Sequence, residues 1–270
     1  MNFTEKLLAA AQKNQSLLCV GLDPDPNLLP KGVGVLEFNK KIIDSTSDLV
    51  CAYKLNLAFY EALDSGFDVL KQTVKYIPDD IFTIGDGKRA DIGNTSRAYA
   101  SSIFDNLNFD AATVNPYLGF DSIEPFLKYT DKGVFILCRT SNAGAVDFQS
   151  LSCETESGLR PLFEVVALKA EEWNTYGNIG LVIGATYPEE LRLLRQAHPD
   201  MPILIPGIGA QGGDLSLAVR YGVDKMGQKA IINSSRQIIY ASRGEDFAEA
   251  ARRVASALRD QINSCLSTRG

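Results

Sequence analysis

The chain has 270 residues, of which 45% are hydrophobic and 22% are charged, as is usual for a soluble globular protein. The net charge of −6 and the isoelectric point near 5.0 exclude a broadly basic surface for nucleic acid, and no apolar run approaches the ~20 residues of a membrane span. We therefore expect a soluble protein that binds neither nucleic acid nor a membrane.

Histidine and cysteine content narrows the chemistry and the compartment. The single histidine, His198, follows a polar helical stretch and precedes Pro199, so we expect it at a surface helix terminus. Histidine-rich metal sites and Ser-His-Asp triads are then not expected, and acid–base chemistry must come from other side chains. The five cysteines form no CxxC pair, and Cys19, Cys51 and Cys138 lie in or beside apolar runs, which indicates a reduced, cytoplasmic protein.

Short apolar runs alternate with longer amphipathic segments along the whole chain, which is the pattern of repeated βα units. Apolar residues recur at helical spacing in most of the connecting segments and in a final stretch after the last strand, 245–266. In chain order, we expect strands over residues 16–22, 49–56, 81–86, 111–115, 133–139, 179–185, 202–207 and 229–234.

Eight βα units without a break in composition predict parallel strands that close into a (β/α)₈ TIM barrel, an α/β fold. We expect one domain over residues 1–270. The alternative is an open doubly wound sheet, which usually has a glycine-rich dinucleotide motif after its first strand. Here that strand ends in GLDPDP. Residues 140–158 form the longest polar connection, as active-site lids often do.

Parallel barrels carry their active sites at the C-terminal ends of the strands. Charged side chains are costly to desolvate there unless they are paired, so a cluster of them at one rim indicates function. The polar residues and loops at the expected strand ends are Asp23, Lys54, Asn56, Asp86, Lys88, Asn115, Arg139, Thr140, Ser141, Thr186, 207–213 and 234–236.

The end of the third expected strand carries the strongest local motif, DGKRADIGNT at residues 86–95. If the backbone stays extended past Asp86, the side chains of Asp86 and Lys88 face the same side, and Asp91 lies beyond the strand. A bare DxKxxD also fits an ordinary loop with a local salt bridge and a helix cap at Asn94 or Thr95.

The last two strands run into PGIGAQGGD and INSSRQI. Glycine-rich turns after these strands, together with a helix N-terminus, commonly form the phosphate site of a barrel. Arg236 would add a bidentate cation for phosphate oxygens, and Gln211 lies in the other turn. The simpler alternative is that these glycines only make tight turns.

Six strings together resemble orotidine 5′-phosphate decarboxylases, in particular the longer bacterial-type branch of that family. The resemblance spans roughly residues 16–243, and the strings are GLDPDP, YKLNLAFYEA, DGKRADIGNT, CRTSNAG, IPGIGAQGGD and SSRQIIYAS. The DxKxxD element alone is shared with relatives that act on sugar phosphates, whereas the combination is far more selective.

The resemblance implies decarboxylation of orotidine 5′-monophosphate to UMP and CO₂, the final step of de novo pyrimidine nucleotide synthesis, with no cofactor and no metal. It makes Lys88 the general acid that protonates C6, with Asp86 and Asp91 as flanking carboxylates. It also implies a homodimer with shared sites, in which Asp91 and Thr95 reach the neighbouring subunit. Further substrate contacts implied by the resemblance are Asp23, Lys54, Asn56 and Thr95 for the ribose, Thr140 and Ser141 for the pyrimidine, and Gln211 and Arg236 for the phosphate.

Three other functions stay open on the residues alone. One is a metal-dependent keto-sugar-phosphate decarboxylase or lyase of the same barrel group, although Lys54 and Asn56 at the second strand fit a metal cage poorly. Another is a Schiff-base aldolase that uses Lys54 or Lys88, although such a lysine works best in an apolar pocket. The last is a catalytically dead barrel that binds a phosphate ligand, although the charged family positions are all present.

Overall fold

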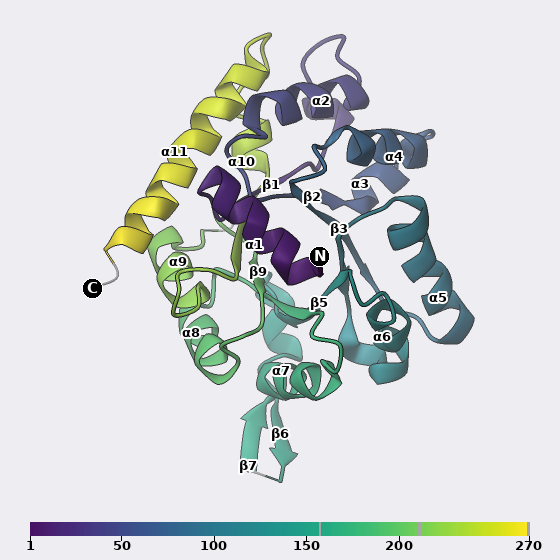
Figure 1. Ribbon diagram of the computed structural model, residues 1–270, viewed down its shortest axis with the longest axis vertical. Coiled ribbons are helices and arrows are strands. Elements are labelled where there is room, and N and C mark those ends of the chain that lie inside the picture. Colours follow the sequence, from purple (N-terminus) through teal and green to yellow (C-terminus); the bar gives the residue numbers. More distant parts are fainter. Residues whose placement is uncertain (157, 210–211, 269–270) are drawn as a thin grey trace.

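The computed structural model describes residues 1–156, 158–209 and 212–268, and its centre is a closed barrel of parallel strands (Figure 1). Its strands are β1 (Leu18–Gly21), β2 (Ala52–Asn56), β3 (Phe82–Arg89), β4 (Ala111–Val114), β5 (Gly133–Arg139), β8 (Ile179–Ile183), β9 (Ile203–Ile205) and β10 (Ala230–Ser234). Around the barrel they are neighbours in the order β1-β10-β9-β8-β5-β4-β3-β2. The barrel closes because β1 pairs with both β2 and β10.

Helices cover the outside of the barrel, and their buried faces carry the apolar residues that were spaced at helical intervals in the sequence. Among the described residues, no helix is long and apolar enough to cross a membrane. The α-helices are α1 (Phe3–Asn14), α2 (Val35–Thr46), α3 (Leu57–Glu61), α4 (Gly66–Tyr76), α5 (Gly93–Ser101), α6 (Phe120–Leu127), α7 (Leu162–Trp173), α8 (Pro188–Ala197), α9 (Leu215–Gly222), α10 (Arg236–Ile239) and α11 (Phe247–Ser267).

The barrel interior is packed with side chains rather than hollow. The strands are apolar on both faces, as expected where one face meets the interior and the other meets helices. Helix α1 lies across the N-terminal end of the barrel and buries Phe3 and Leu7 there (Figure 1). Only the C-terminal end is therefore left open for a site. The inner cluster also holds Cys51, which precedes β2, and the strand residues Cys19, Ala52, Phe82, Ile84, Ala111, Phe135, Val182, Leu204 and Ile231.

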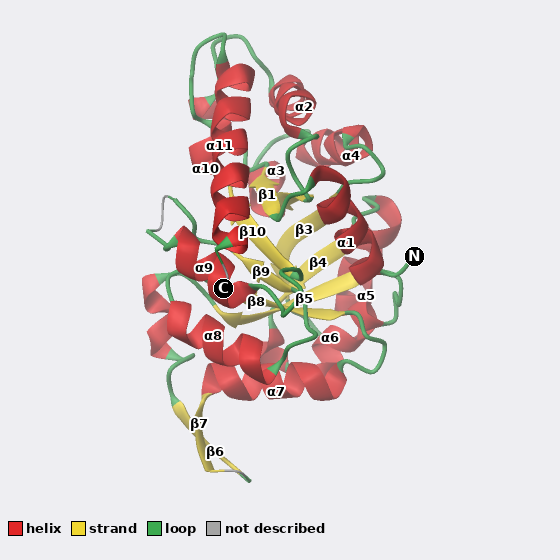
Figure 2. Ribbon diagram, turned by 60° about the vertical axis from the view of Figure 1, so that its left-hand side comes forward, coloured by secondary structure: helices red, strands yellow, loops and turns green. Residues whose placement is uncertain are grey.

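The eight expected strands are all present in the barrel, so the expected fold class is confirmed and the open sheet is not. One strand runs further than expected, because β3 continues past Asp86 to Arg89. The prediction of one loop over residues 140–158 was wrong for the second half of that segment. It holds the start of an antiparallel hairpin of β6 (Ser152–Thr155) and β7 (Gly158–Pro161) that projects away from the barrel (Figure 2). Its strands are short and exposed, so no apolar periodicity marks them.

The expected surface position of His198 was also wrong. His198 is the C-cap of α8, as a helix terminus should be, but its side chain is only 3% exposed. His198 Nδ1 lies 3.0 Å from a carboxylate oxygen of Glu171, a residue of α7. The single histidine is therefore a buried packing residue, and it does not line the cavity described next.

Candidate active site

A cavity of about 480 Å³ opens at the C-terminal ends of the barrel strands, the end at which barrel enzymes carry their active sites. Its wall combines charged side chains from β2 and β3 with polar side chains from the loops after β5 and β10. The residues predicted from the sequence that line this cavity are Asp23, Lys54, Asp86, Lys88, Thr140, Ser141 and Arg236.

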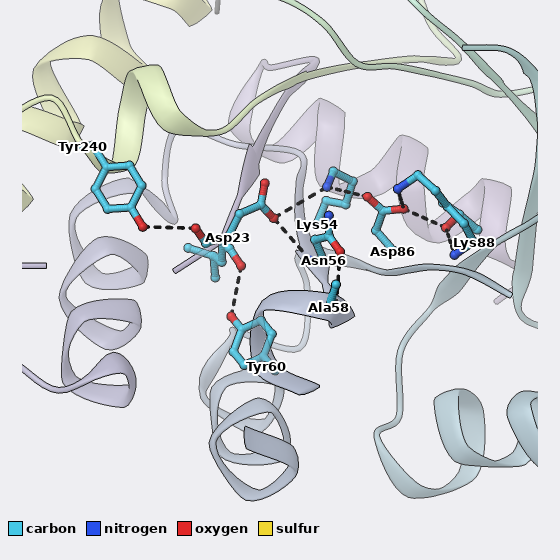
Figure 3. A network of polar contacts seen from close by, with 10 residues as sticks. Asp23, Lys54, Asn56, Ala58, Tyr60, Asp86, Lys88 and Tyr240 are labelled. Carbon is cyan, nitrogen blue, oxygen red and sulfur yellow. Dashed lines mark hydrogen bonds and ion pairs between the residues drawn. The ribbon is translucent and has the colours of Figure 1, made fainter. Parts of the chain in front are cut away.

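Four charged side chains of alternating sign form a row across three neighbouring strand ends (Figure 3). The ammonium group of Lys54 lies 2.8 Å from Asp86 Oδ2 and 3.8 Å from Asp23 Oδ1. The other oxygen of Asp86 lies 2.7 Å from the ammonium group of Lys88. Because β1, β2 and β3 are adjacent and in register, these residues meet without any long reach of their side chains.

Burial makes the inner part of this row a fixed electrostatic feature. The side chains of Lys54 and Asp86 are 6% and 7% exposed. Burial by itself would raise the pKa of Asp86, but Lys54 and Lys88 more than offset it and hold that pKa well below its usual range. Burial likewise would lower the pKa of Lys54, but Asp23 and Asp86 raise it well above its usual range. Both groups are therefore charged at neutral pH.

Lys88 stands at the outer end of the row and faces the open cavity. Its side chain is 47% exposed, and Asp86 is its ion-pair partner. The expectation that Asp86 and Lys88 share one side is confirmed, because their side chains form an ion pair at 2.7 Å. The backbone of Lys88 is left-handed, with φ of +46°, which is uncommon for a residue other than glycine and often occurs at functional sites.

Asn56 contributes to the local structure around Asp23. Its side-chain oxygen caps α3 by accepting a hydrogen bond from the backbone amide of Ala58. Its backbone amide donates to Asp23 Oδ1 at 3.3 Å. Tyr240 Oη donates to the backbone oxygen of Asp23 at 3.1 Å (Figure 3). Asn56 is thus beside the charged row, although its side chain is not part of the cavity wall.

Asp91 and Thr95 lie outside the cavity of their own chain. Asp91 follows β3, and its carboxylate accepts a hydrogen bond from the Ile92 amide at 2.8 Å. Thr95 is exposed in the first turn of α5. Neither residue is part of the cavity wall, so within one chain the structure does not bring them to Lys88.

The loop after β5 forms a polar wall opposite the charged row. The amide of Thr140 donates to Gln149 Oε1 at 2.9 Å, and Gln149 Nε2 donates to Thr140 Oγ1 at 2.8 Å. The Thr140 hydroxyl then donates to Asn142 Oδ1 at 2.7 Å. Ser141 completes this wall, and the carbonyl of Ser141 accepts from Thr186.

The loops after β9 and β10 provide the remaining side of the cavity. Gly207 adopts a φ of +101°, a conformation that only glycine adopts readily, and it lines the cavity beside Ile208. Arg236, the first residue of α10, is exposed at the same rim. Gln211 lies outside the described residues, so its predicted position is not assigned.

Several residues of the cavity wall were not predicted. Thr113, Leu137, Val182, Leu204 and Asn233 sit on barrel strands and face inward. Strand alternation places them there, but the inward face cannot be told from the outward one in strands that are apolar on both sides. Asn142 and Gln149 belong to the polar 140–158 connection, whose length indicated function. Asn142 lies in the string CRTSNAG but was given no role, and Gln149 lies outside every motif.

The fold and the cavity define a (β/α)₈-barrel enzyme with a charged lysine–carboxylate row at its open end. Residues 16–254 match the sequence model of the orotidine 5′-phosphate decarboxylase / HUMPS family, and the chain belongs to that family. It is 56% identical over 264 residues to orotidine 5′-phosphate decarboxylase of Dehalococcoides mccartyi, covering 97% of this chain and 98% of that one. The corresponding protein of Ralstonia pickettii is 52% identical over 272 residues, with 97% and 98% covered.

Solved structures agree with these relatives. The structure of Leishmania donovani OMP decarboxylase superposes with a TM-score of 0.84 at 37% identity, covering 99% of this chain and all of that one. The structure of Leishmania donovani UMP synthase gives a TM-score of 0.88 at 40% identity, with all of this chain matching 57% of that longer chain.

Proposed function

We propose that this protein decarboxylates orotidine 5′-monophosphate to UMP and CO₂, the last step in the synthesis of UMP. The observation that carries the proposal is the row Asp23–Lys54–Asp86–Lys88 in the cavity. It occurs in a chain that is 56% identical to the orotidine 5′-phosphate decarboxylase of Dehalococcoides mccartyi. A location in the cytoplasm belongs to the same proposal.

The reaction leaves a difficult carbanion for the protein to stabilise. When the bond from C6 to the carboxylate breaks, its electron pair stays on C6 in the ring plane, and no neighbouring carbonyl can delocalise it. Fixed charges must then supply the stabilisation, mainly in the transition state. We assign this role to the Lys88 ammonium, which transfers a proton to C6 as CO₂ leaves and is reprotonated from solvent.

Asp86 supports Lys88 from the buried side. Its carboxylate contacts the Lys88 ammonium at 2.7 Å and is itself held by Lys54 at 2.8 Å. This arrangement fixes the position of Lys88 and favours its charged form. In the proposal, Asp91 of the neighbouring subunit is the second carboxylate of the site.

The remaining contacts divide among the three parts of the substrate. We propose that the loop after β5 hydrogen-bonds to the pyrimidine and that the glycine-rich turns after β9 and β10 bind the phosphate. Asp23 and Lys54 lie at the ends of β1 and β2, and β1 adjoins β10, so we assign them to the ribose beside the phosphate. The proposed substrate contacts are Asp23, Lys54, Asn56 and Thr95 for the ribose, Thr140 and Ser141 for the pyrimidine, and Gln211 and Arg236 for the phosphate.

The metal-dependent keto-sugar-phosphate alternative is not favoured. Within the described residues, no group of three or more His, Cys, Asp or Glu side chains could hold a metal ion. The two carboxylates at the mouth that could start such a site, Asp23 and Asp86, both contact Lys54 instead. An assay decides between the substrates. The proposal is supported if the protein turns over orotidine monophosphate but does not turn over a keto-sugar phosphate in the presence of Mg²⁺. It is contradicted if only the keto-sugar phosphate is turned over.

We predict that Arg236→Ala weakens phosphate recognition. A charge-assisted hydrogen bond is worth roughly 1.5–3 kcal/mol, so KM for orotidine monophosphate should rise about tenfold to 150-fold. Steady-state assays should show little change for the phosphate-free nucleoside. Arg220→Ala, at an exposed residue of α9, is the control and should leave both substrates unaffected. Equal losses on both substrates with Arg236→Ala would show that this residue does not bind the phosphate.

A homodimer with shared sites is also part of the proposal. Asp91 stands at the rim beside exposed apolar side chains of two adjacent loops, Ile92 and Tyr117, which are 55% and 81% exposed. The β3 and β4 ends that carry these loops are hydrogen-bonded to each other. A two-fold pair would cover this apolar rim and place each Asp91 at the neighbouring mouth.

We predict that mixing two inactive variants, Lys88→Ala and Asp91→Ala, restores activity. In a mixed dimer one site carries both lesions and the other carries neither. An equal mixture with free subunit exchange should recover about a quarter of wild-type activity per total site. The measurement is decarboxylation before and after mixing, with native mass spectrometry to confirm exchange. If exchange occurs and no activity returns, Asp91 acts within its own chain.

A further inference from the structure

Thr113 links the backbone of Lys88 to the carboxylate that holds its side chain. Thr113 lies on β4 and is 1% exposed. Its Oγ1 accepts a hydrogen bond from the Lys88 amide at 2.9 Å and donates one to Asp86 Oδ1 at 2.8 Å. The same Asp86 oxygen accepts from Lys88 Nζ at 2.7 Å. Lys88 is thus tied at both its backbone and its ammonium to one pair of buried groups.

The backbone of Lys88 is irregular, so its amide needs a hydrogen-bond acceptor outside the strand ladder. The left-handed φ of Lys88, +46°, is disfavoured for a residue with a Cβ. The pairing of β3 with β4 also changes register between Gly85 and Arg89. The Lys88 amide therefore leaves the regular strand ladder and takes the Thr113 hydroxyl as its acceptor. Without that hydroxyl, the amide and one Asp86 oxygen would each lose a partner.

We propose that Thr113 is a positioning residue that sets where the Lys88 ammonium stands in the cavity. The proposal rests on the proposed function, because it concerns the lysine assigned to protonate C6. A hydroxyl has one hydrogen, so Thr113 must accept from the Lys88 amide and donate to Asp86. That fixed direction requires an acceptor oxygen on Asp86 and an amide of Lys88 that points at Thr113, as it does in this structure.

The test replaces the hydroxyl without changing the shape of the side chain. In Thr113→Val, kcat for orotidine monophosphate should fall about 30- to 100-fold, because misplacing a catalytic group by about 1 Å costs on the order of 10²-fold. KM and the Kd for UMP should stay within about threefold, since ground-state contacts persist. Thr113→Ser keeps the hydroxyl and should restore kcat to within about threefold of wild type.

Thr83 provides a matched control within the same barrel. It lies on β3 toward the N-terminal end, where its Oγ1 accepts from the Asp110 amide at 3.1 Å and donates to Asp110 Oδ2 at 2.9 Å. Thr83→Val therefore removes the same kind of buried bridge far from the cavity. We expect both valine variants to lose some thermal stability, but Thr83→Val should leave kcat within about twofold of wild type.

The outcomes are distinct. Full kcat in Thr113→Val, equal kcat losses in the two valine variants, or no rescue by serine would each overturn the positioning role. If Thr113→Val does not fold, Thr113→Ala carries the same comparison with Thr113→Ser. A wild-type protein that does not decarboxylate orotidine monophosphate would instead contradict the proposed function and would be seen before any variant is made.

Discussion

Lys88→Ala should abolish decarboxylation while leaving the fold intact. Lys88 supplies both the proton for C6 and the positive charge that faces the carbanion, and general acids and preorganised charges each contribute on the order of 10²- to 10⁴-fold. We therefore expect kcat/KM to fall at least about 10⁴-fold, or ~5.5 kcal/mol of transition-state stabilisation. The side chain is 47% exposed, so its loss should hardly change the melting temperature.

A surface lysine gives the matched control for this variant. Lys128 forms an exposed ion pair with Glu124 on the outside of the barrel, and Lys128→Ala should retain wild-type activity. If Lys88→Ala keeps more than about a tenth of wild-type kcat, the barrier has changed by less than ~1.4 kcal/mol, and Lys88 is not the general acid.

Asp86→Asn should damage both activity and stability. The substitution removes the charge that Lys54 and Lys88 share, and breaking a buried ion pair typically costs about 3–5 kcal/mol of folding free energy. Activity should fall at least about a hundredfold, because Lys88 loses the partner that positions it. Assays of kcat/KM and urea unfolding measure the two effects. Asp48→Asn, at an exposed pair with Arg252, should cost at most about 1 kcal/mol.

The stability effect of Asp86 has a defined pH dependence. Its pKa is held below the usual range in the folded protein, so its contribution is fully present above the unfolded pKa near 3.9 and is lost as the pH falls through the folded pKa. The difference in unfolding free energy between wild type and Asp86→Asn should therefore be constant from pH 7 to pH 5. A difference that already shrinks in that interval would show that Asp86 is not held ionised by its lysine partners.

The barrel could be predicted because its strands are apolar on both faces and alternate regularly with amphipathic helices. The hairpin β6–β7 could not be, since strands that contact no core leave no apolar periodicity, and exposed residues such as Leu159 and Glu154 fit a loop equally well. His198 was misplaced for a related reason. Its local sequence describes the end of α8, whereas its burial arises from contacts made only in the folded chain, among them the one with Glu171 of α7.

The charged row was predictable because a charged residue at the end of an apolar strand is unusual, and β1, β2 and β3 bring three such ends together. Thr113 was not predicted, since a threonine within an apolar strand is ordinary and its importance depends on the left-handed backbone of Lys88 on the neighbouring strand. Asp91 stood out in the DxKxxD motif, but the roles of Asp91 and Thr95 in a neighbouring site came from the family resemblance, and one chain does not bring them to the cavity.

The most direct test of the central claim is to mix the purified protein with orotidine monophosphate in the presence of EDTA and to follow the absorbance of the orotate ring. The proposed mechanism uses the protein's own charges at the cavity mouth, above all the ammonium of Lys88. We predict that the absorbance falls as UMP and CO₂ form, at the same rate with and without the chelator. An absorbance that does not change, or that falls only when a divalent metal is restored, would contradict decarboxylation by the protein's own charges.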